Sequence, residues 1–523
     1  MQMRLTKEIC VAEEVPMLKL LLVDLGDVRG ELNEPLGIEC ISSRVIREKK
    51  VQVNVCWYNM IESEAVFLES LLEYDVIGIS MNIGSLERFE HIYAFLLKYG
   101  TNKFPLILGG CIPTFAYEQL IERYDNIICI YGEGEEAFFE LIHCYEEGTF
   151  DNLDRLRKIG NLAFMYRNEK VITPKISLDL QREETTVRDK MILAYIREHH
   201  GIIRLEGSRG CSWNKCSFCC VNAKYANPEW RGFPIDKIVK ELIEISDMGF
   251  CSPYFTDEDF FGQDYDRAIK LGEKIIELKK SGKIRNEMNF FISIMAADAI
   301  CEMGKKALAV LKEAGLREVF LGIESLEKEQ LKRYHKKASI DTNKKAIAVI
   351  RELGLCIDSG YILFDPEMSF ESLGNSLSYI EDLKMNQLDS RSLKRLRIQP
   401  LTSIYSTLSN VVVGNLDINN LEYPYKFMDK NVNAVYEAYT RWEKSDINKT
   451  WKIQSASRGE VSDDLRKELK LLLCQMRDID FDVLKHIYMC VKSERQNACE
   501  SAFMEAKKQQ RDQVIQKAYH LLA

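Results

Sequence analysis

The chain has 523 residues, of which 46% are hydrophobic and 29% charged, and its formal net charge is −9. This length allows two or three domains with separate cores, and the mild acidic excess disfavours nucleic acid as the main partner, because phosphate binding needs a basic face. No apolar run approaches the roughly 20 residues of a membrane span, and residues 1–16 lack the apolar core of a signal peptide. We therefore expect a cytoplasmic protein without membrane or nucleic-acid partners, whose 16 cysteines are reduced thiols or metal ligands.

Residues 1–150 predict a doubly wound, Rossmann-like domain, because short apolar runs alternate with helical periodicity. The expected strands are 18–24, 51–56, 76–81, 105–108 and 127–130. The expected helices are 37–49, 65–74, 86–99, 117–124 and 135–145. Ligands of such sheets bind at the carboxyl ends of the strands, where a glycine lets the backbone approach them closely. The candidate residues at those ends are Asn82, Gly84, Ser85, Gly109, Gly110, Gly132 and Gly134.

A second alternation follows a charged connection, 151–200, that contains a predicted hairpin at 162–172. Within residues 201–405 the expected strands are 202–205, 252–256, 289–293, 318–321, 357–364 and 396–399. The expected helices are 234–248, 266–280, 305–314, 342–353 and 370–383. This pattern predicts a partial (β/α)6 barrel with its site at the carboxyl ends of the strands. Strand signals fade after the barrel, so residues 406–523 are expected to form a helical C-terminal domain.

Three cysteines, Cys211, Cys216 and Cys219, lie on the loop that follows the first expected barrel strand. Three thiolates this close suit a soft metal and especially an iron–sulfur cluster, in which one iron would stay open for another ligand. A zinc site is the alternative, but structural zinc takes four ligands, usually as two separated pairs. Neither the adjacent Cys220 nor the histidines at 199–200 supply a standard spacing for it.

The chain resembles the radical S-adenosylmethionine (SAM) enzymes in these cysteines, in the aromatic residue before the last of them, and in three later motifs. The motifs are Phe-Thr-Asp-Glu-Asp-Phe at 255–260, Leu-Gly-Ile-Glu-Ser at 321–325 and Gly-Tyr-Ile-Leu-Phe-Asp-Pro at 360–366. The cysteine spacing departs from the family pattern, because four residues instead of three separate Cys211 from Cys216. The resemblance implies that the cysteines hold a [4Fe–4S] cluster whose fourth iron binds SAM. It also implies SAM contacts from Phe218, Thr256, Asp257, Glu258, Ser293, Glu324 and Ser325.

Residues 105–110, 113–114 and 131–135 resemble the cobalamin-binding domain that precedes the barrel in one branch of that family. The chain has no Asp-x-His-x-x-Gly motif, so no histidine is positioned to replace the lower cobalt ligand. The resemblance implies a corrinoid between the domains, with its nucleotide tail among the strand-end residues named above. The alternative is a domain that keeps this fold without the cofactor, since glycines at strand ends are also ordinary turn residues.

With both cofactors, the resemblance implies methylation of an unactivated carbon in a small-molecule or peptide substrate. The reaction would use a 5′-deoxyadenosyl radical and methylcobalamin, with electrons from a flavodoxin- or ferredoxin-type donor. We assign no catalytic acid or base. Radical rearrangement, cyclisation or oxidation without methyl transfer is the alternative, with or without cobalamin. A cluster-based sensor would not need the SAM motifs, and a transfer-RNA methylthiotransferase would need a basic C-terminal domain in place of a helical one of mixed charge.

Overall fold

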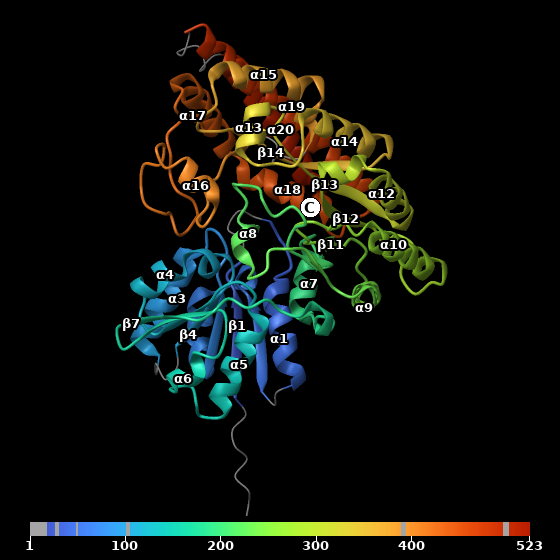
Figure 1. Cartoon of the computed structure of the whole chain (residues 1–523). Coiled ribbons are helices and arrows are strands. Elements are labelled where there is room, and N and C mark those ends of the chain that lie inside the picture. The colour runs from blue at the N-terminus through green and yellow to red at the C-terminus, as the bar shows by residue number, and fades with distance from the viewer. Residues whose placement is uncertain are drawn as a thin grey trace, which may run out of the picture.

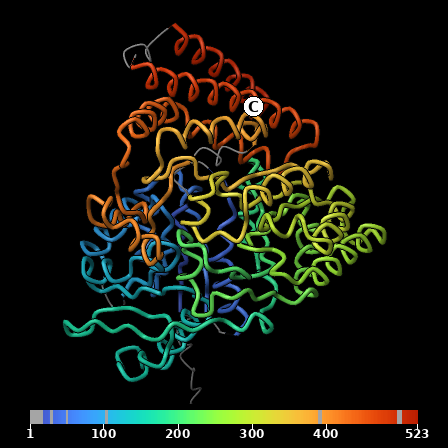
Figure 2. The backbone as a smooth tube through the Cα atoms, turned by 45° about the horizontal axis from the view of Figure 1, so that its top comes forward, coloured from blue at the N-terminus to red at the C-terminus, as the bar shows by residue number. Residues whose placement is uncertain are grey.

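The computed structural model describes residues 18–26, 31–48, 51–100, 105–388, 394–494 and 502–522. Two sheets and a set of C-terminal helices follow one another along the chain, and the first domain and those helices lie on opposite sides of the second sheet (Figure 1). The long helices α19 (Asp463–Lys492) and α20 (Ala502–Leu522), both red, run beside each other far from the blue first domain (Figure 2). Within the described ranges, every helix is too short or too polar to cross a lipid bilayer.

The first sheet has seven strands in the order β2-β1-β3-β4-β5-β6-β7. Its strands are β1 (Lys19–Asp24), β2 (Gln52–Trp57), β3 (Val76–Ser80), β4 (Leu106–Gly109), β5 (Ile127–Ile130), β6 (Leu162–Tyr166) and β7 (Glu169–Ile172). The helices of this part are α1 (Leu36–Glu48), α2 (Glu64–Ser70), α3 (Leu86–Tyr99), α4 (Cys111–Arg123), α5 (Glu135–Glu146), α6 (Leu153–Leu156) and α7 (Lys190–Glu198). The five parallel strands β1–β5 confirm the predicted doubly wound domain.

Both faces of this sheet are covered, which explains the continuous apolar runs in the sequence. Along β1, Leu20 and Leu22 pack into one apolar cluster, whereas Leu21 and Val23 pack into another. Successive side chains of a strand point to opposite faces, so each of these runs fills two layers of core at once.

Two predicted elements of this region differ from the structure. The hairpin at 162–172 forms, but β6 pairs antiparallel with β5, so it extends the first sheet instead of lying apart in a connection. The helix expected at 117–124 begins earlier, at Cys111. The helical period is broken at Ala116, where φ is −137°, and the sequence pattern therefore revealed only the part after the kink.

The second sheet is a parallel, open barrel of six strands in the order β15-β14-β13-β12-β11-β8. These strands are β8 (Arg204–Leu205), β11 (Tyr254–Phe255), β12 (Phe290–Met295), β13 (Leu316–Glu324), β14 (Cys356–Phe364) and β15 (Lys394–Arg395). The main helices around them are α9 (Ile235–Asp247), α10 (Tyr265–Lys280), α11 (Ala296–Ile300), α12 (Glu302–Ala314), α13 (Lys328–Arg333), α14 (Ile340–Glu352) and α15 (Phe370–Asp382). This arrangement confirms the predicted partial barrel.

The last expected barrel strand, 396–399, was placed too late in the chain. β15 ends at Arg395, and only the Leu396 N–H still bonds to the sheet, through the Phe364 carbonyl oxygen at 2.7 Å. Leu396 and Ile398 are both buried, but in a small cluster around Tyr334. Residues 396–399 therefore show the alternation of buried and less buried residues that is typical of a strand, although they lie outside the sheet.

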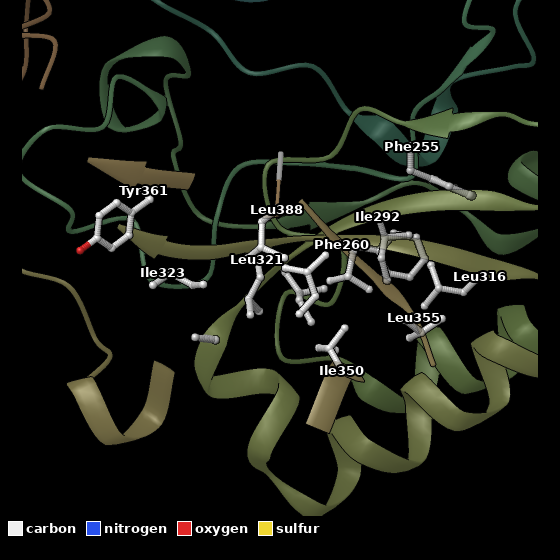
Figure 3. Packing of buried hydrophobic residues seen from close by; sticks show 14 of the residues in the cluster. Phe255, Phe260, Ile292, Leu316, Leu321, Ile323, Ile350, Leu355, Tyr361 and Leu388 are labelled. Atoms are coloured by element: carbon white, nitrogen blue, oxygen red, sulfur yellow. The ribbon is translucent and has the colours of Figure 1, made fainter. Parts of the chain in front are cut away.

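The barrel and its helices share the largest apolar core of the chain. Figure 3 shows Phe255, Phe260, Ile292 and Leu321 within this core, and all four are at most 1% exposed. The C-terminal part adds α16 (Ser403–Thr407), α17 (Lys430–Lys444) and α18 (Ile447–Arg458) to α19 and α20, which confirms the predicted helical C-terminal region. Domain boundaries at 150, 200 and 405 remain our proposal.

Arg209 joins the first domain to the barrel. It lies on β9 (Ser208–Arg209), which pairs with β10 (Arg231–Gly232) just before the cysteine loop. Its Nη1 is 2.8 Å from Glu133 Oε1, in the loop after β5, and its Nη2 is 2.5 Å from Glu135 Oε1, at the start of α5. Its Nε is 2.9 Å from Glu206 Oε1. Burial opposes the charge of Arg209, but Glu135 and Glu206 outweigh it and raise its pKa further.

We predict that Arg209→Gln destabilises the chain by about 3–5 kcal/mol, because it leaves buried carboxylates without their counter-ion. The matched control is Arg123→Gln, which removes the same charge from a pair with Glu90 whose side chains are 51% and 37% exposed, and should cost less than about 1 kcal/mol. Urea unfolding at pH 7 measures both. If the two variants lose equal free energy of unfolding, the Arg209 junction contributes no more to stability than a surface ion pair.

Candidate active site

The three predicted cluster ligands lie on one loop between β9 and α8 (Val221–Lys224), at the carboxyl end of β8. Burial raises the pKa of Cys219 well above its usual value, and the sulfur atoms of Cys220, Cys216 and Cys211 raise it further. Burial also raises the pKa of Cys216, to about 11. The thiols are therefore close enough to repel one another as anions, and binding a metal would release their protons.

The donor set fits an iron–sulfur cluster, because it consists of three thiols on one loop. In the described part of the chain, no three or more His, Cys, Asp or Glu side chains are arranged to hold a metal ion. The histidines considered for a zinc site lie elsewhere. The His199 ring packs on Tyr195 with centroids 4.2 Å apart, and His200 Nδ1 is 3.2 Å from the carbonyl oxygen of Glu460.

Three consecutive carboxylates after β11 hold this loop from one side. Asp257 accepts hydrogen bonds from the Gly207 N–H at 2.9 Å and from the Ser208 hydroxyl. Asp259 accepts from the Ser212 N–H at 3.1 Å and from its hydroxyl at 2.7 Å. The acidic motif thus braces the backbone before and after Cys211, and Asp257 does so with its side chain 3% exposed.

Glu258 connects the same motif to the helix after the cysteines. Its Oε1 is 2.8 Å from Lys224 Nζ and accepts a hydrogen bond of 2.8 Å from the Tyr225 hydroxyl, and its Oε2 accepts from the Gly210 N–H at 3.2 Å. Burial opposes ionisation of Glu258, but Lys224 and these hydrogen bonds outweigh it and lower its pKa. Glu258 is therefore an ionised partner of the loop.

The loop after α13 holds the cysteine loop from the other side. The Ser217 N–H donates to the Tyr334 carbonyl oxygen at 3.0 Å, and Trp213 Nε1 donates to the His335 carbonyl oxygen at 2.8 Å. The Tyr334 hydroxyl donates to Asp365 at 2.7 Å, and the Tyr334 ring packs edge-on against Phe218 at 5.1 Å. Asp365 belongs to the predicted 360–366 motif, so this motif supports the cysteine loop through Tyr334.

A carboxylate and a lysine fill the space that two paired glycines leave between β13 and β14. Gly322 and Gly360 are partners in register, and an ideal Cβ would lie 3.0 Å from Lys336 Nζ on the first and 3.2 Å from Glu324 Oε2 on the second. Glu324 Oε1 and Lys336 Nζ are 3.0 Å apart. Burial opposes the charge of Lys336, but Glu324 and the Cys216 sulfur raise its pKa. Glu324 also has φ of +62°, a strained value for this residue type.

The remaining predicted SAM contacts differ in how much of each side chain is engaged. Ser325 is fully buried, and its hydroxyl bonds to Gln330 Oε1 at 2.7 Å, which makes it a turn residue. Thr256 is only weakly engaged, with its hydroxyl 3.5 Å from the Leu205 carbonyl oxygen. Ser293 lies on β12 and is 9% exposed. Thr256 and Ser293 thus lack strong side-chain hydrogen bonds to the described part of the chain, whereas Glu324 is held by its ion pair with Lys336.

The first domain presents its predicted ligand edge to the cysteine loop. An ideal Cβ on Gly132 would lie 3.1 Å from the Lys224 carbonyl oxygen, and Gly132 has φ of +87°. Gly109 has no atom within 4 Å of its Cβ position. Gly110 closes a turn instead, since φ is +91° and a Cβ would lie 2.8 Å from the Met81 carbonyl oxygen. A Cβ on Gly134 would lie 3.4 Å from Ile41.

The predicted ligand residues after β3 form hydrogen bonds with other parts of the chain. Asn82 Nδ2 donates to the buried Asp24 carboxylate at 3.1 Å, and the Ser85 hydroxyl donates to the Asn82 carbonyl oxygen at 2.7 Å. The Gly84 N–H donates to the carbonyl oxygen of Asn419, at 2.8 Å. Asn419 belongs to the segment after α16, whose Leu421 is buried in the core of the first domain.

Sequence reasoning missed Arg209, Asp259 and Lys336. Arg209 could have been noticed from its position two residues before Cys211, and Asp259 from its place in the acidic run. No sequence pattern marks Lys336, because it lies far from the cysteines in the chain. Only the fold brings its loop next to the cysteine loop.

We predict that Asp257→Asn changes how stability depends on pH. Burial raises the pKa of Asp257 to about 7 from a usual value of 3.8, so the folded state retains a proton that the unfolded state has lost. Stability is then full below the unfolded pKa and falls as pH rises towards 7. Between pH 5 and 6.5, the free energy of unfolding should fall by up to about 1.4 kcal/mol per pH unit more in the native chain than in the variant. Parallel urea-unfolding curves would contradict this.

Comparisons with known proteins cover both sheets. A family model for the radical SAM superfamily matches residues 205–374, and a model for the B12 binding domain matches residues 23–142. A 4′-phospho-dehydrooxetanocin synthase of Priestia megaterium is 26% identical over 73% of this chain and 51% of that protein. The hopanoid C-3 methylase of Methylococcus capsulatus is 25% identical over 65% of this chain and 62% of that protein. The chain thus spans about half of the first relative's length.

Solved structures share the fold across most of the chain. The cobalamin-dependent SAM radical enzyme OxsB, with aqua-cobalamin and SAM bound, superposes with a TM-score of 0.78 at 20% identity, over 97% of this chain and 80% of that chain. The methyltransferase TsrM of Kitasatospora setae, with cobalamin and a [4Fe–4S] cluster bound, gives 0.65 at 14% identity, over 91% and 100%.

The matched models also define the cofactors. The radical SAM domain implies a [4Fe–4S] cluster and SAM, and the B12-binding domain implies cobalamin. The motifs that carried the sequence resemblance lie within or beside the matched ranges, and the two domains follow one another in the expected order. The chain therefore carries a radical SAM domain that is preceded by a B12-binding domain.

Proposed function

We propose that this enzyme transfers a methyl group from SAM to an unactivated carbon of a small-molecule or peptide substrate. The observation that supports this best is the contact of Gly132 with Lys224, because the ligand edge of the first sheet meets the helix that directly follows the cysteines. A corrinoid on that edge would face SAM on the cluster across one shared space. When bound, the cluster and SAM supply a radical that removes a hydrogen atom, and the corrinoid carries the methyl group.

The chain's own residues would bind and orient these groups. Cys211, Cys216 and Cys219 are the proposed cluster ligands, and Thr256, Ser293 and Glu324 are the proposed SAM contacts. The ion pairs of Arg209 with Glu133 and Glu135 close the junction beside the loop, which would help to exclude water from the radical. Electrons would come from a flavodoxin- or ferredoxin-type donor.

We predict that Cys211→Ala, Cys216→Ala and Cys219→Ala each lose most of the iron taken up during anaerobic reconstitution, whereas Cys220→Ala retains it. The adjacent Cys220 is a matched control, because it is also half-buried and has a pKa that burial raises to about 11. Iron and sulfide analysis, with the absorbance of the cluster, measures the difference. Loss of iron in the Cys220 variant alone would overturn the ligand assignment.

The proposed reaction is tested by the products formed from SAM. After reconstitution with iron, sulfide and hydroxocobalamin, and with a chemical reductant, the enzyme should form both 5′-deoxyadenosine and S-adenosylhomocysteine. Gly109→Leu fills the open space at the end of β4 and should weaken hydroxocobalamin binding by at least about tenfold, while 5′-deoxyadenosine formation persists. Gly37→Leu is the control, since Gly37 also has no atom within 4 Å of its Cβ position.

Each outcome distinguishes one part of the proposal. Bound cobalamin without S-adenosylhomocysteine would favour radical rearrangement, cyclisation or oxidation over methyl transfer. Equal cobalamin binding in the two glycine variants would remove the carboxyl end of β4 from the corrinoid site.

A further inference from the structure

A second pocket lies at the opposite end of the barrel from the cysteine loop. Its volume is about 460 Å³, and its wall includes Glu318 near the start of β13 and Cys356 at the start of β14. The facing wall comes from α19, through Lys470 and Cys474. The size falls within the roughly 300–1,000 Å³ of small-molecule sites. Because the cysteine loop follows the carboxyl end of β8, the depth of the barrel separates the two sites.

The wall of this pocket carries five cations and one carboxylate. The carboxylate is Glu318, and the cations are Arg351, Lys384, Arg458, Lys470 and Arg477. Two of the cations serve the fold: Arg458 Nη2 is 2.7 Å from Glu318 Oε1 and 2.8 Å from Asp358 Oδ2, and Lys470 also pairs with Glu318. These pairs fasten the C-terminal helices to the base of the barrel.

The other three cations have no such partner. No carboxylate in the described ranges lies within ion-pair distance of Arg351, Lys384 or Arg477. Arg351 Nη2 donates to the Lys384 carbonyl oxygen at 3.3 Å, and Arg477 Nη1 donates to the Gln387 carbonyl oxygen at 3.2 Å. Arg477 Nε is buried without a hydrogen-bond partner. Arg351 and Lys384 are exposed at the rim of the pocket, where both can reach a ligand.

We propose that this pocket binds a phosphate-bearing metabolite at a site separate from the catalytic one. Guanidinium groups match the geometry of phosphate oxygens and bind them with charge-assisted hydrogen bonds, and a phosphate with nearly two charges at neutral pH would offset most of the excess. The wall also has an apolar part, formed by Leu355, Leu388, Leu471 and Leu473, which would receive the body of the molecule, beside the polar Gln387, Gln454 and Ser457. Such a ligand would bridge α14, α19 and the base of the barrel.

Thermal unfolding of the full chain with sodium pyrophosphate at constant ionic strength tests this site. The native chain should gain stability in a saturable way, and Arg351→Gln/Arg477→Gln should bind pyrophosphate at least about tenfold more weakly. The control is Lys345→Gln/Lys467→Gln, which removes two charges from the same two helices, at side chains that are 64% and 78% exposed. The control should behave as the native chain does.

The Arg351→Gln/Arg477→Gln variant should be at least as stable as the native chain without pyrophosphate, because it relieves repulsion between unpaired cations. Equal saturable shifts in the two double variants would overturn the proposal. So would a shift of the native chain that rises linearly and is matched by sodium sulfate.

A measurement on the unmodified chain gives an independent answer. Cys356 is exposed on the pocket wall, whereas Cys111 is exposed in the first domain. Pyrophosphate should slow alkylation of Cys356 by neutral N-ethylmaleimide at least about threefold, and should leave that of Cys111 unchanged, as followed by peptide mass spectrometry. Unchanged alkylation of Cys356 at saturating pyrophosphate would place the anion elsewhere. Neither measurement depends on methyl transfer, so this site and the proposed reaction succeed or fail separately.

Discussion

The geometry of the active site depends on one buried guanidinium. Arg209 is 9% exposed at its side chain and takes carboxylates from the first domain, through Glu133 and Glu135, and from its own segment, through Glu206. Removing these charges from water is costly, and the cost is recovered only while all partners are in place. Because Arg209 is followed directly by Gly210 and Cys211, a shift of either domain would strain the cysteine loop. Charge pairing thus fixes the spacing between the carboxyl edge of the first sheet and the cysteine loop.

Several residues of the motifs that resemble SAM contacts also support the cysteine loop. Asp257 and Asp259 bind its backbone, and Asp365 acts through Tyr334. A buried polar side chain that bonds to backbone is rigid, because leaving either group unpaired would cost free energy. Rigid support holds the cysteine loop in one geometry and so fixes the position of any group that the loop binds.

Much of the fold could be predicted because parallel strands covered on both faces leave continuous apolar runs, as in β1 and β5. Prediction failed where the same burial arises without a sheet, as at Leu396 and Ile398, and where a kink at Ala116 hides half of a helix. The three cysteines were singled out from their closeness in the sequence together with the resemblance of the later motifs to the radical SAM enzymes. Glu133 pairs with Arg209, Asp257 bonds to Gly207, and Lys336 pairs with Glu324. Most of these contacts join segments that are distant in the chain, and a single sequence does not record which distant segments meet.

The two ends of the barrel differ in how they balance charge. At the carboxyl end, Glu258 meets Lys224 and Glu324 meets Lys336, so each of these two carboxylates beside the cysteine loop has one cationic partner. At the amino end, Glu318 and Asp358 are matched by Arg458 and Lys470, and three further cations remain. Fastening the C-terminal helices to the barrel needs only the matched set. The three further cations are therefore not needed for that fastening, and they are the groups that the proposed phosphate-bearing ligand would contact.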